Sequence, residues 1–356
     1  MCPAHDGSTS ERVLVIGQPF QEYVRMVADG FRICGVSAEI LEFETPRQGP
    51  VQQLKNALSR DYFFGRSEAM KRANALAMER AVMNHAPDYV VVMNGGEVTD
   101  ATRSYCTRNG IRMAMWANDS CSRFKWIADA ARFYDVVYSY ELNDLEVLSQ
   151  SGTAHLLPMA YDPARYSPID NGTVENVDVS FVGTIKSYYG RRTEMLRQLS
   201  TGLKRARLEI WSNATPFYSP LRYQDVLIRI AGGNSTVRRS NATHEQINEL
   251  YNRTRICLNI HGSTEHKALN PRSFEILGSG GFLLTDNPFR ALKDFEEGRD
   301  YVVYNGPDDL VQKARKYLQD EEARKRIKES GHRIARKSHT YAARAAEILK
   351  GLRQES

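Results

Sequence analysis

Short apolar runs alternate with amphipathic stretches along most of this 356-residue chain. The run RVLVI at 12–16 is followed by apolar residues at positions 20, 23, 24, 27 and 31, which is the spacing of one helix face. A second example is the apolar run at 89–93 with the helix pattern at 99–109. Strands that alternate with helices favour βαβ units around a parallel sheet that is covered on both faces. The pattern predicts an α/β protein, with a mixed α+β arrangement as the alternative.

The alternation occurs twice, so the sequence predicts two similar doubly wound, Rossmann-like domains. The expected division is a tail at 1–10, a first domain at 11–166, a polar linker at 167–176, a second domain at 177–337 and a final helix at 338–356. Among the elements expected in the first domain are a helix at 141–150 and a last strand at 156–166. Those expected in the second include strands at 177–182, 207–211, 256–260, 281–285 and 301–304, and helices at 190–204, 220–232, 243–254, 271–279 and 288–295. In such sheets ligands bind beyond the carboxyl ends of the strands, so the expected site is a cleft between the two domains.

Composition excludes several classes of protein. The apolar runs are far shorter than the ~20 residues of a membrane span, and the mean hydropathy is −0.50. The five cysteines are scattered and form no CxxC pair, which favours the cytoplasm and no structural zinc site. A net charge of +5 is compatible with anionic ligands or peripheral contact with an anionic membrane, and too diffuse to indicate nucleic acid.

The segment 258–285 (LNIHGSTEHKALNPRSFEILGSGGFLLT) is the most informative one for function. Asn270 and Pro271 have the residue types of a helix N-cap and first helical position. The free N–H groups of such a helix start form an anion site, to which Arg272 adds a guanidinium. Glu275 could accept hydrogen bonds from the two hydroxyls of a ribose. The alternative is that Glu275 is an ordinary surface carboxylate paired with Arg272.

This segment, with EEGRDYVVYNGPDDL and SHTYAARAAEIL after it, resembles the C-terminal half of the CgeB-like (spore maturation protein) glycosyltransferases of the GT-B superfamily. The resemblance is dense from about 177 to 352 and thinner before. It implies a nucleotide-sugar donor on the second domain, an acceptor on the first, and a last helix that crosses back to the first domain. Carried over residue by residue, it implies donor contacts from Asn259, His261, Asn270, Arg272, Phe274 and Glu275. Many retaining GT-B enzymes carry a second glutamate eight positions earlier, where this chain has Lys267, so the stereochemical outcome stays open.

A second basic segment, GTIKSYYGRR at 183–192, follows the first expected strand of the second domain. Gly183, Lys186 and Arg192 are the residues we expect to contact a diphosphate, and the resemblance favours Arg192 over Arg191. The alternative is that the two arginines are solvated side chains on the first turn of a helix.

Transfer to a hydroxyl benefits from a general base in the first domain. Asp119 in the loop WANDS and Glu97 in NGGEV are the candidates, because each follows an expected strand. The local resemblance to the family favours Asp119 as the first candidate. The alternatives are a helix cap for Asp119 and an exposed carboxylate for Glu97. With neither a DxD motif nor a His/Cys cluster, we expect no metal and no cofactor, the leaving diphosphate being neutralised by cationic side chains.

These observations predict a metal-independent glycosyltransferase that moves a sugar from a nucleotide-diphosphate donor, UDP- or TDP-linked in the first place, to an acceptor that the sequence does not specify. A nucleotide-sugar epimerase on the same double fold and a non-catalytic binding protein for nucleotides or sugars are the two alternatives.

Overall fold

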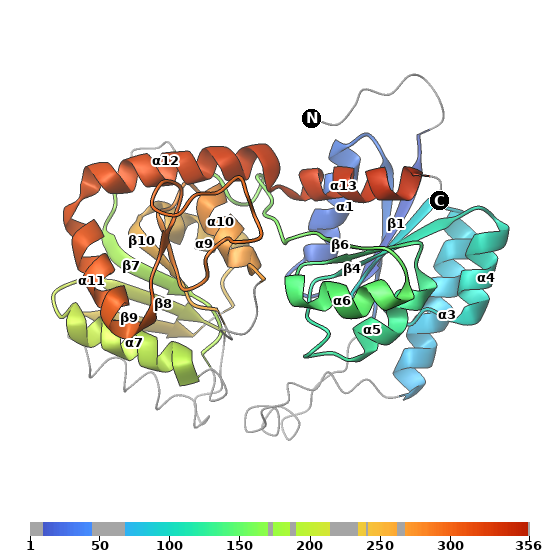
Figure 1. The fold of residues 1–356 in the computed structure, drawn as a ribbon, viewed down its shortest axis with the longest axis horizontal. Helices are drawn as coiled ribbons and strands as arrows, with labels where there is room; N and C mark the ends of the chain where they lie inside the picture. The colour runs from blue at the N-terminus through green and yellow to red at the C-terminus, as the bar shows by residue number, and fades with distance from the viewer. Residues whose placement is uncertain are drawn as a thin grey trace. The chain divides into compact units, whose positions relative to one another are not determined.

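The computed structural model describes residues 10–44, 68–169, 174–185, 190–213, 234–239, 241–261 and 268–354. In this part of the chain two compact units each contain a six-stranded parallel sheet (Figure 1). The first unit runs to Ala160 and resumes at His339, and the second includes Tyr161–Ser338. The sequence analysis placed these two boundaries at 166 and 337. The predicted α/β fold with two Rossmann-like sheets is confirmed.

The sheet of the first unit has the order β2-β1-β3-β4-β5-β6, with all neighbours parallel. Its inner strands are buried on both faces, which requires the continuous apolar runs seen in the sequence. The strands are β1 (Arg12–Gly17), β2 (Ser37–Glu42), β3 (Tyr89–Met93), β4 (Arg112–Ala117), β5 (Val136–Ser139) and β6 (Ala154–Leu156).

Helices cover both faces of this sheet. On one face lie α3 (Glu68–His85), α4 (Asp100–Arg108), α5 (Trp126–Ala130) and α6 (Leu145–Leu148), and on the other α1 (Tyr23–Ile33) and α13 (Tyr341–Arg353). The last helix, α13, packs on α1 so closely that a Cβ atom at Gly30 would lie 2.6 Å from the carbonyl oxygen of Tyr341. Arg344 of α13 donates hydrogen bonds to the carbonyl oxygens of Pro158 (2.7 Å) and Met159 (3.1 Å). The end of the described chain therefore completes the first unit, as expected.

The sheet of the second unit has the order β12-β11-β10-β7-β8-β9, again all parallel. Its strands are β7 (Val177–Val182), β8 (Leu208–Ser212), β9 (Ser235–Arg239), β10 (Thr254–Asn259), β11 (Leu283–Thr285) and β12 (Val302–Val303). The helices α7 (Gly190–Gly202) and α11 (Gly306–Gln319) pack on one face. On the other lie α9 (His244–Asn252) and α10 (Pro271–Gly278), with α12 (Glu321–Ser338) packed on α10.

Three expected elements differ from the structure, and one strand was not expected. Strand β9 was not predicted, and the helix expected at 288–295 is a series of turns. The helix expected at 141–150 is α6 flanked by two 3-10 turns. In place of the strand expected at 156–166, the structure has β6 at Ala154–Leu156, so the two share only Leu156. Pro158 and Pro163, which follow β6, lack the N–H groups that a sheet needs. The helix expected at 220–232 lies outside the described residues.

Candidate functional site

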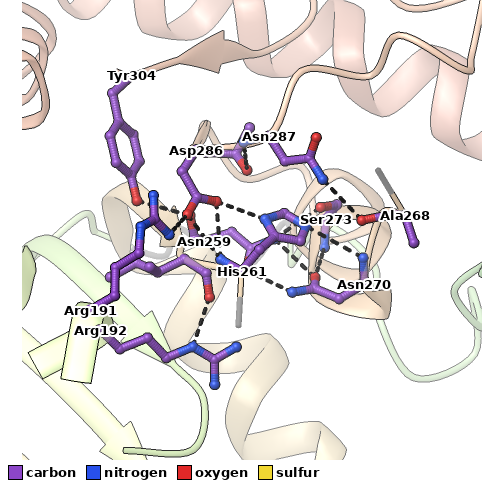
Figure 2. Close-up of polar contacts among 12 residues, drawn as sticks. Arg191, Arg192, Asn259, His261, Ala268, Asn270, Ser273, Asp286, Asn287 and Tyr304 are labelled. Carbon is purple, nitrogen blue, oxygen red and sulfur yellow. Dashed lines mark hydrogen bonds and ion pairs between the residues drawn. The ribbon is translucent and has the colours of Figure 1, made fainter. Parts of the chain in front are cut away.

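The strand order of the second unit places a topological switch point between β7 and β10. From β7 the chain proceeds outward to β8 and β9, and from β10 it proceeds the opposite way to β11 and β12. The loops that leave the carboxyl ends of β7 and β10 therefore diverge, and in open α/β sheets the crevice between such loops is where ligands bind. Figure 2 shows the polar residues gathered at this edge.

The start of α10 is fixed to the end of β10 by two amides. The Asn270 side chain caps the helix by accepting the Ser273 N–H at 3.3 Å, and Pro271 is the first helical residue. The Nδ2 of Asn259 donates to Asn270 Oδ1 at 2.9 Å, and the Nδ2 of Asn270 donates back to Asn259 Oδ1 at 3.2 Å (Figure 2). Asn259 is 2% exposed. The pair therefore orients the N–H groups of the first turn of α10, whose positive dipole end favours an anion.

Arg272 and Glu275 form an ion pair on the first two turns of α10. Their Nη1 and Oε2 atoms lie 2.5 Å apart, and the side chains are 19% and 3% exposed. An arginine at this helix end opposes the helix dipole, and the carboxylate of Glu275 offsets that repulsion. The alternative expectation of a Glu275–Arg272 pair is therefore correct for the pairing, but Glu275 is buried and not a surface carboxylate. It leaves the Arg272 guanidinium partly accessible beside the start of the helix.

Asp286, which the sequence analysis did not identify, joins three elements at the same edge. It follows β11, and its side chain is 2% exposed. Its carboxylate accepts the backbone N–H of His261 at 3.0 Å, the ring Nδ1 of His261 at 2.7 Å and a hydrogen bond from Nη1 of Arg191 (Figure 2). Burial opposes ionisation, but the hydrogen bonds from His261 and Arg191 outweigh it and hold the pKa of Asp286 below its usual range. The sequence offered one signal that could have identified Asp286: an acidic residue directly after the strand expected at 281–285.

The two arginines on the first turn of α7, Arg191 and Arg192, make different contacts. Arg192 donates from Nε to the carbonyl oxygen of Ile260 and from Nη1 to that of Thr184, both at 2.9 Å, so it ties the exit of β10 to the exit of β7. Arg191, in contrast, is bound to Asp286 and is 32% exposed. Gly183 follows β7, and its backbone N–H donates to the carbonyl oxygen of Trp211 at 3.0 Å. The sequence resemblance favoured Arg192 as the ligand contact, whereas the geometry draws attention to Arg191.

Two of the predicted donor residues are not placed at this edge by the structure. The Phe274 ring is fully buried, and its centroid lies 6.3 Å from that of Phe289. It therefore packs in the interior of the unit and holds α10 in place. Lys186 lies outside the described residues, as does Lys267. The other predicted contacts of the second domain, at Gly183, Asn259, His261, Asn270, Arg272 and Glu275, lie on the loops and helix starts around β7 and β10.

In the first unit, Asn94 organises the edge that carries the candidate bases. Asn94 adopts φ 58°, and its Oδ1 accepts the N–H groups of Asn118 (2.8 Å) and Asp119 (3.0 Å), so the loops after β3 and β4 are joined. Asp119 forms an ion pair with Arg123 at 2.8 Å. Glu97 is half-buried, and its charge adds to the effect of burial in raising the pKa of Tyr134. Both carboxylates thus lie on loops at the carboxyl edge, and their role as bases stays a prediction.

Metal-binding groups and membrane-spanning helices are both absent from the part of the chain that the structure describes. Among the described residues, no group of three His, Cys, Asp or Glu side chains could hold a metal ion. No helix in those ranges has the length and apolar character needed to cross a bilayer.

Comparison with known proteins gives a family match over part of the chain and several solved structures with a similar fold. Residues 191–350 match the family described as glycosyl transferase-like. None of the curated proteins matches the sequence. Solved structures with a similar fold include the sucrose-phosphate synthase of Thermosynechococcus elongatus, with 9% identity and a TM-score of 0.66, covering 96% of this chain and 98% of that one.

Two further structures are similar over nearly the whole chain. The Anabaena protein HepE in complex with UDP and glucose has 11% identity and a TM-score of 0.63, with 96% of this chain and 99% of that one covered. AviGT4, a glycosyltransferase involved in avilamycin A biosynthesis, has 15% identity and a TM-score of 0.61, with 96% and 97% covered. The chain therefore shares the two-domain GT-B fold of these structures, and its residues 191–350 match a glycosyl transferase-like family.

Proposed function

We propose that this protein transfers a glycosyl group from a nucleotide-diphosphate sugar, UDP-linked in the first place and TDP-linked as the second choice, to an acceptor hydroxyl. The observation that carries the proposal is the capped start of α10 at the switch point, with Arg272 on its first turn and Glu275 beside it. Helix N-termini and guanidinium groups both recognise phosphate oxygens. The Anabaena protein, solved with UDP and glucose, supports the choice of UDP.

In the proposed reaction the bond between the anomeric carbon and the diphosphate oxygen breaks, and a bond from that carbon to the acceptor oxygen forms. The nucleoside diphosphate leaves with the electron pair, and its negative charge is stabilised by Arg272, Arg191 and the N–H groups of α10. The acceptor proton goes to a carboxylate of the first unit, for which Asp119 is the first candidate and Glu97 the second. We propose that this charge stabilisation needs no metal ion.

A ligand screen followed by a transfer assay tests the proposal. Because a ligand that binds only the native state raises the melting temperature, UDP, TDP and GDP are compared by thermal shift, and UDP is expected to give the largest rise. UDP-sugars are then incubated with and without candidate hydroxyl acceptors. Acceptor-dependent release of UDP supports transfer, and its persistence in EDTA supports metal independence.

Two outcomes contradict the proposal. A folded chain that binds none of the three nucleotides has no donor site of this kind. Conversion of the donor sugar into its epimer, with no acceptor present and no UDP released, would identify the epimerase alternative. Activity that is lost in EDTA and restored by Mg²⁺ would overturn metal independence alone.

A further inference from the structure

We propose that Asp286 is a positioning residue of the donor site, and that it acts by holding Arg191 where the guanidinium contacts the diphosphate of the donor. The inference rests on the proposed function and deepens it, because it names a residue pair that the sequence did not identify. Arg191 is on the first turn of α7 and Asp286 follows β11, so the pair spans the switch point between β7 and β10.

The carboxylate of Asp286 is itself held in place. Its Oδ1 accepts both the backbone N–H of His261, at 3.0 Å, and the ring Nδ1 of His261, at 2.7 Å. The Nε2 of His261 lies 3.5 Å from the backbone N of Asn270, so the ring bridges Asp286 and the start of α10 (Figure 2). The Oδ2 atom also accepts the His261 N–H, at 3.2 Å, and receives Nη1 of Arg191. The buried carboxylate is therefore fixed from the β10 side while it binds Arg191.

The guanidinium of Arg191 is bound to protein through its Nη1 atom, and the side chain is partly exposed. Within the described ranges, its guanidinium makes no other hydrogen bond to protein, and the side chain is 32% exposed. A guanidinium has five N–H donors in a rigid fork, so one can be anchored while the others remain available to phosphate oxygens. Arg192, the neighbouring cation, instead donates to the carbonyl oxygens of Ile260 and Thr184. Arg191 is thus the arginine of α7 that is oriented in advance for an anion.

A purely structural ion pair is the competing explanation, and a double-mutant cycle separates the two. UDP affinity is measured by calorimetry for wild type, Arg191→Ala, Asp286→Asn and the double variant. Loss of one charge-assisted contact to phosphate predicts a Kd roughly 10- to 100-fold weaker for Arg191→Ala. Asp286→Asn is expected to weaken binding roughly 5- to 20-fold, and by less than roughly twofold when Arg191 is already alanine, because contacts in one network do not add.

Asp300→Asn provides the matched control. Asp300 is also fully buried, is paired with an arginine (Arg299) at 2.7 Å, and belongs to the same unit, but it lies in the turn before β12. Its replacement should lower the melting temperature and leave UDP affinity unchanged.

The results separate this inference from the function on which it rests. Wild type that binds no nucleoside diphosphate contradicts the proposed function. Wild type that binds UDP, with Arg191→Ala unchanged or with additive effects of the two substitutions, overturns the role of Asp286 alone. Arg191 is partly exposed, so its alanine variant keeps the inference testable even if Asp286→Asn does not fold.

Discussion

Replacing Arg272 by alanine is expected to affect stability and ligand binding through separate causes. The Glu275 side chain is 3% exposed and lies 2.5 Å from Arg272, so the substitution leaves a buried carboxylate without this partner. Breaking a buried pair in this way costs about 3–5 kcal/mol. That is a large part of the ~5–15 kcal/mol that stabilises a typical folded chain. The variant should therefore show a clear decrease in the free energy of unfolding.

A second substitution separates the two effects. In the double variant Arg272→Ala, Glu275→Gln the buried charge is gone, and we expect the unfolding free energy to recover to within about 1–2 kcal/mol of wild type because a neutral amide costs less to bury than a charge. The affinity for UDP should stay roughly 10- to 100-fold below wild type, because the guanidinium is still absent. Urea unfolding gives the stability, and calorimetric titration gives the affinity.

Two results would refute this reasoning. A cost below about 1 kcal/mol for Arg272→Ala would mean that the pair is screened by solvent like a surface ion pair. Unchanged affinity for UDP in a folded variant would remove Arg272 from the proposed donor site.

Two further predictions concern stability. Gly30→Ala should lower the free energy of unfolding by about 1–3 kcal/mol, because the new methyl group would lie 2.6 Å from the Tyr341 carbonyl oxygen. Gly190→Ala would meet no atom of the described residues within 4 Å and should not be destabilising, so urea midpoints that fall equally in both variants would contradict this. For Asp300, burial raises the pKa, but hydrogen bonds from Arg299 and Ser330 outweigh it and lower the pKa overall. The ionised Asp300 therefore contributes its full stabilisation of the folded state above the unfolded-state pKa of ~3.9, and this contribution is lost as the pH falls further. The stability difference between wild type and Asp300→Asn should shrink in acid. A difference in urea midpoint that stays constant from pH 7 to pH 3 would contradict this prediction.

The sequence predicts the strands whose side chains are mostly buried, because burial on both faces of a sheet requires a run of apolar residues. Strands β1, β3 and β7 are buried over most of their length and stand out as runs of Val, Ile, Leu and Phe. Strand β9 reads STVRR and lies at the edge of its sheet, where one side needs no partner and polar residues are tolerated, so no apolar run announces it. At 288–295 the apolar spacing of a helix is present, but Phe289 stacks on Tyr301 at 4.1 Å, and tertiary packing decides the conformation.

The candidate site divides in the same way. The N-cap at Asn270 and the Arg272–Glu275 pair depend on neighbours in sequence, so their spacing predicts them. The contact between His261 and Asp286 joins residues 25 positions apart, through strand pairing that a single sequence does not specify. The sequence likewise does not show that Arg192 donates to two backbone carbonyl oxygens, because it does not distinguish Arg192 from its neighbour Arg191.

The return of α13 to the first unit has a consequence for synthesis of the protein. Residues 339–354 cover α1 and the end of the first sheet, yet they are translated after the whole second unit. While the ribosome makes the second unit, α1 can pack on β1 and β2, but the surface of α1 that α13 covers has no partner from its own chain. We therefore expect a nascent or truncated chain that stops before residue 339 to depend on chaperones, and a separately added α13 peptide to restore its solubility.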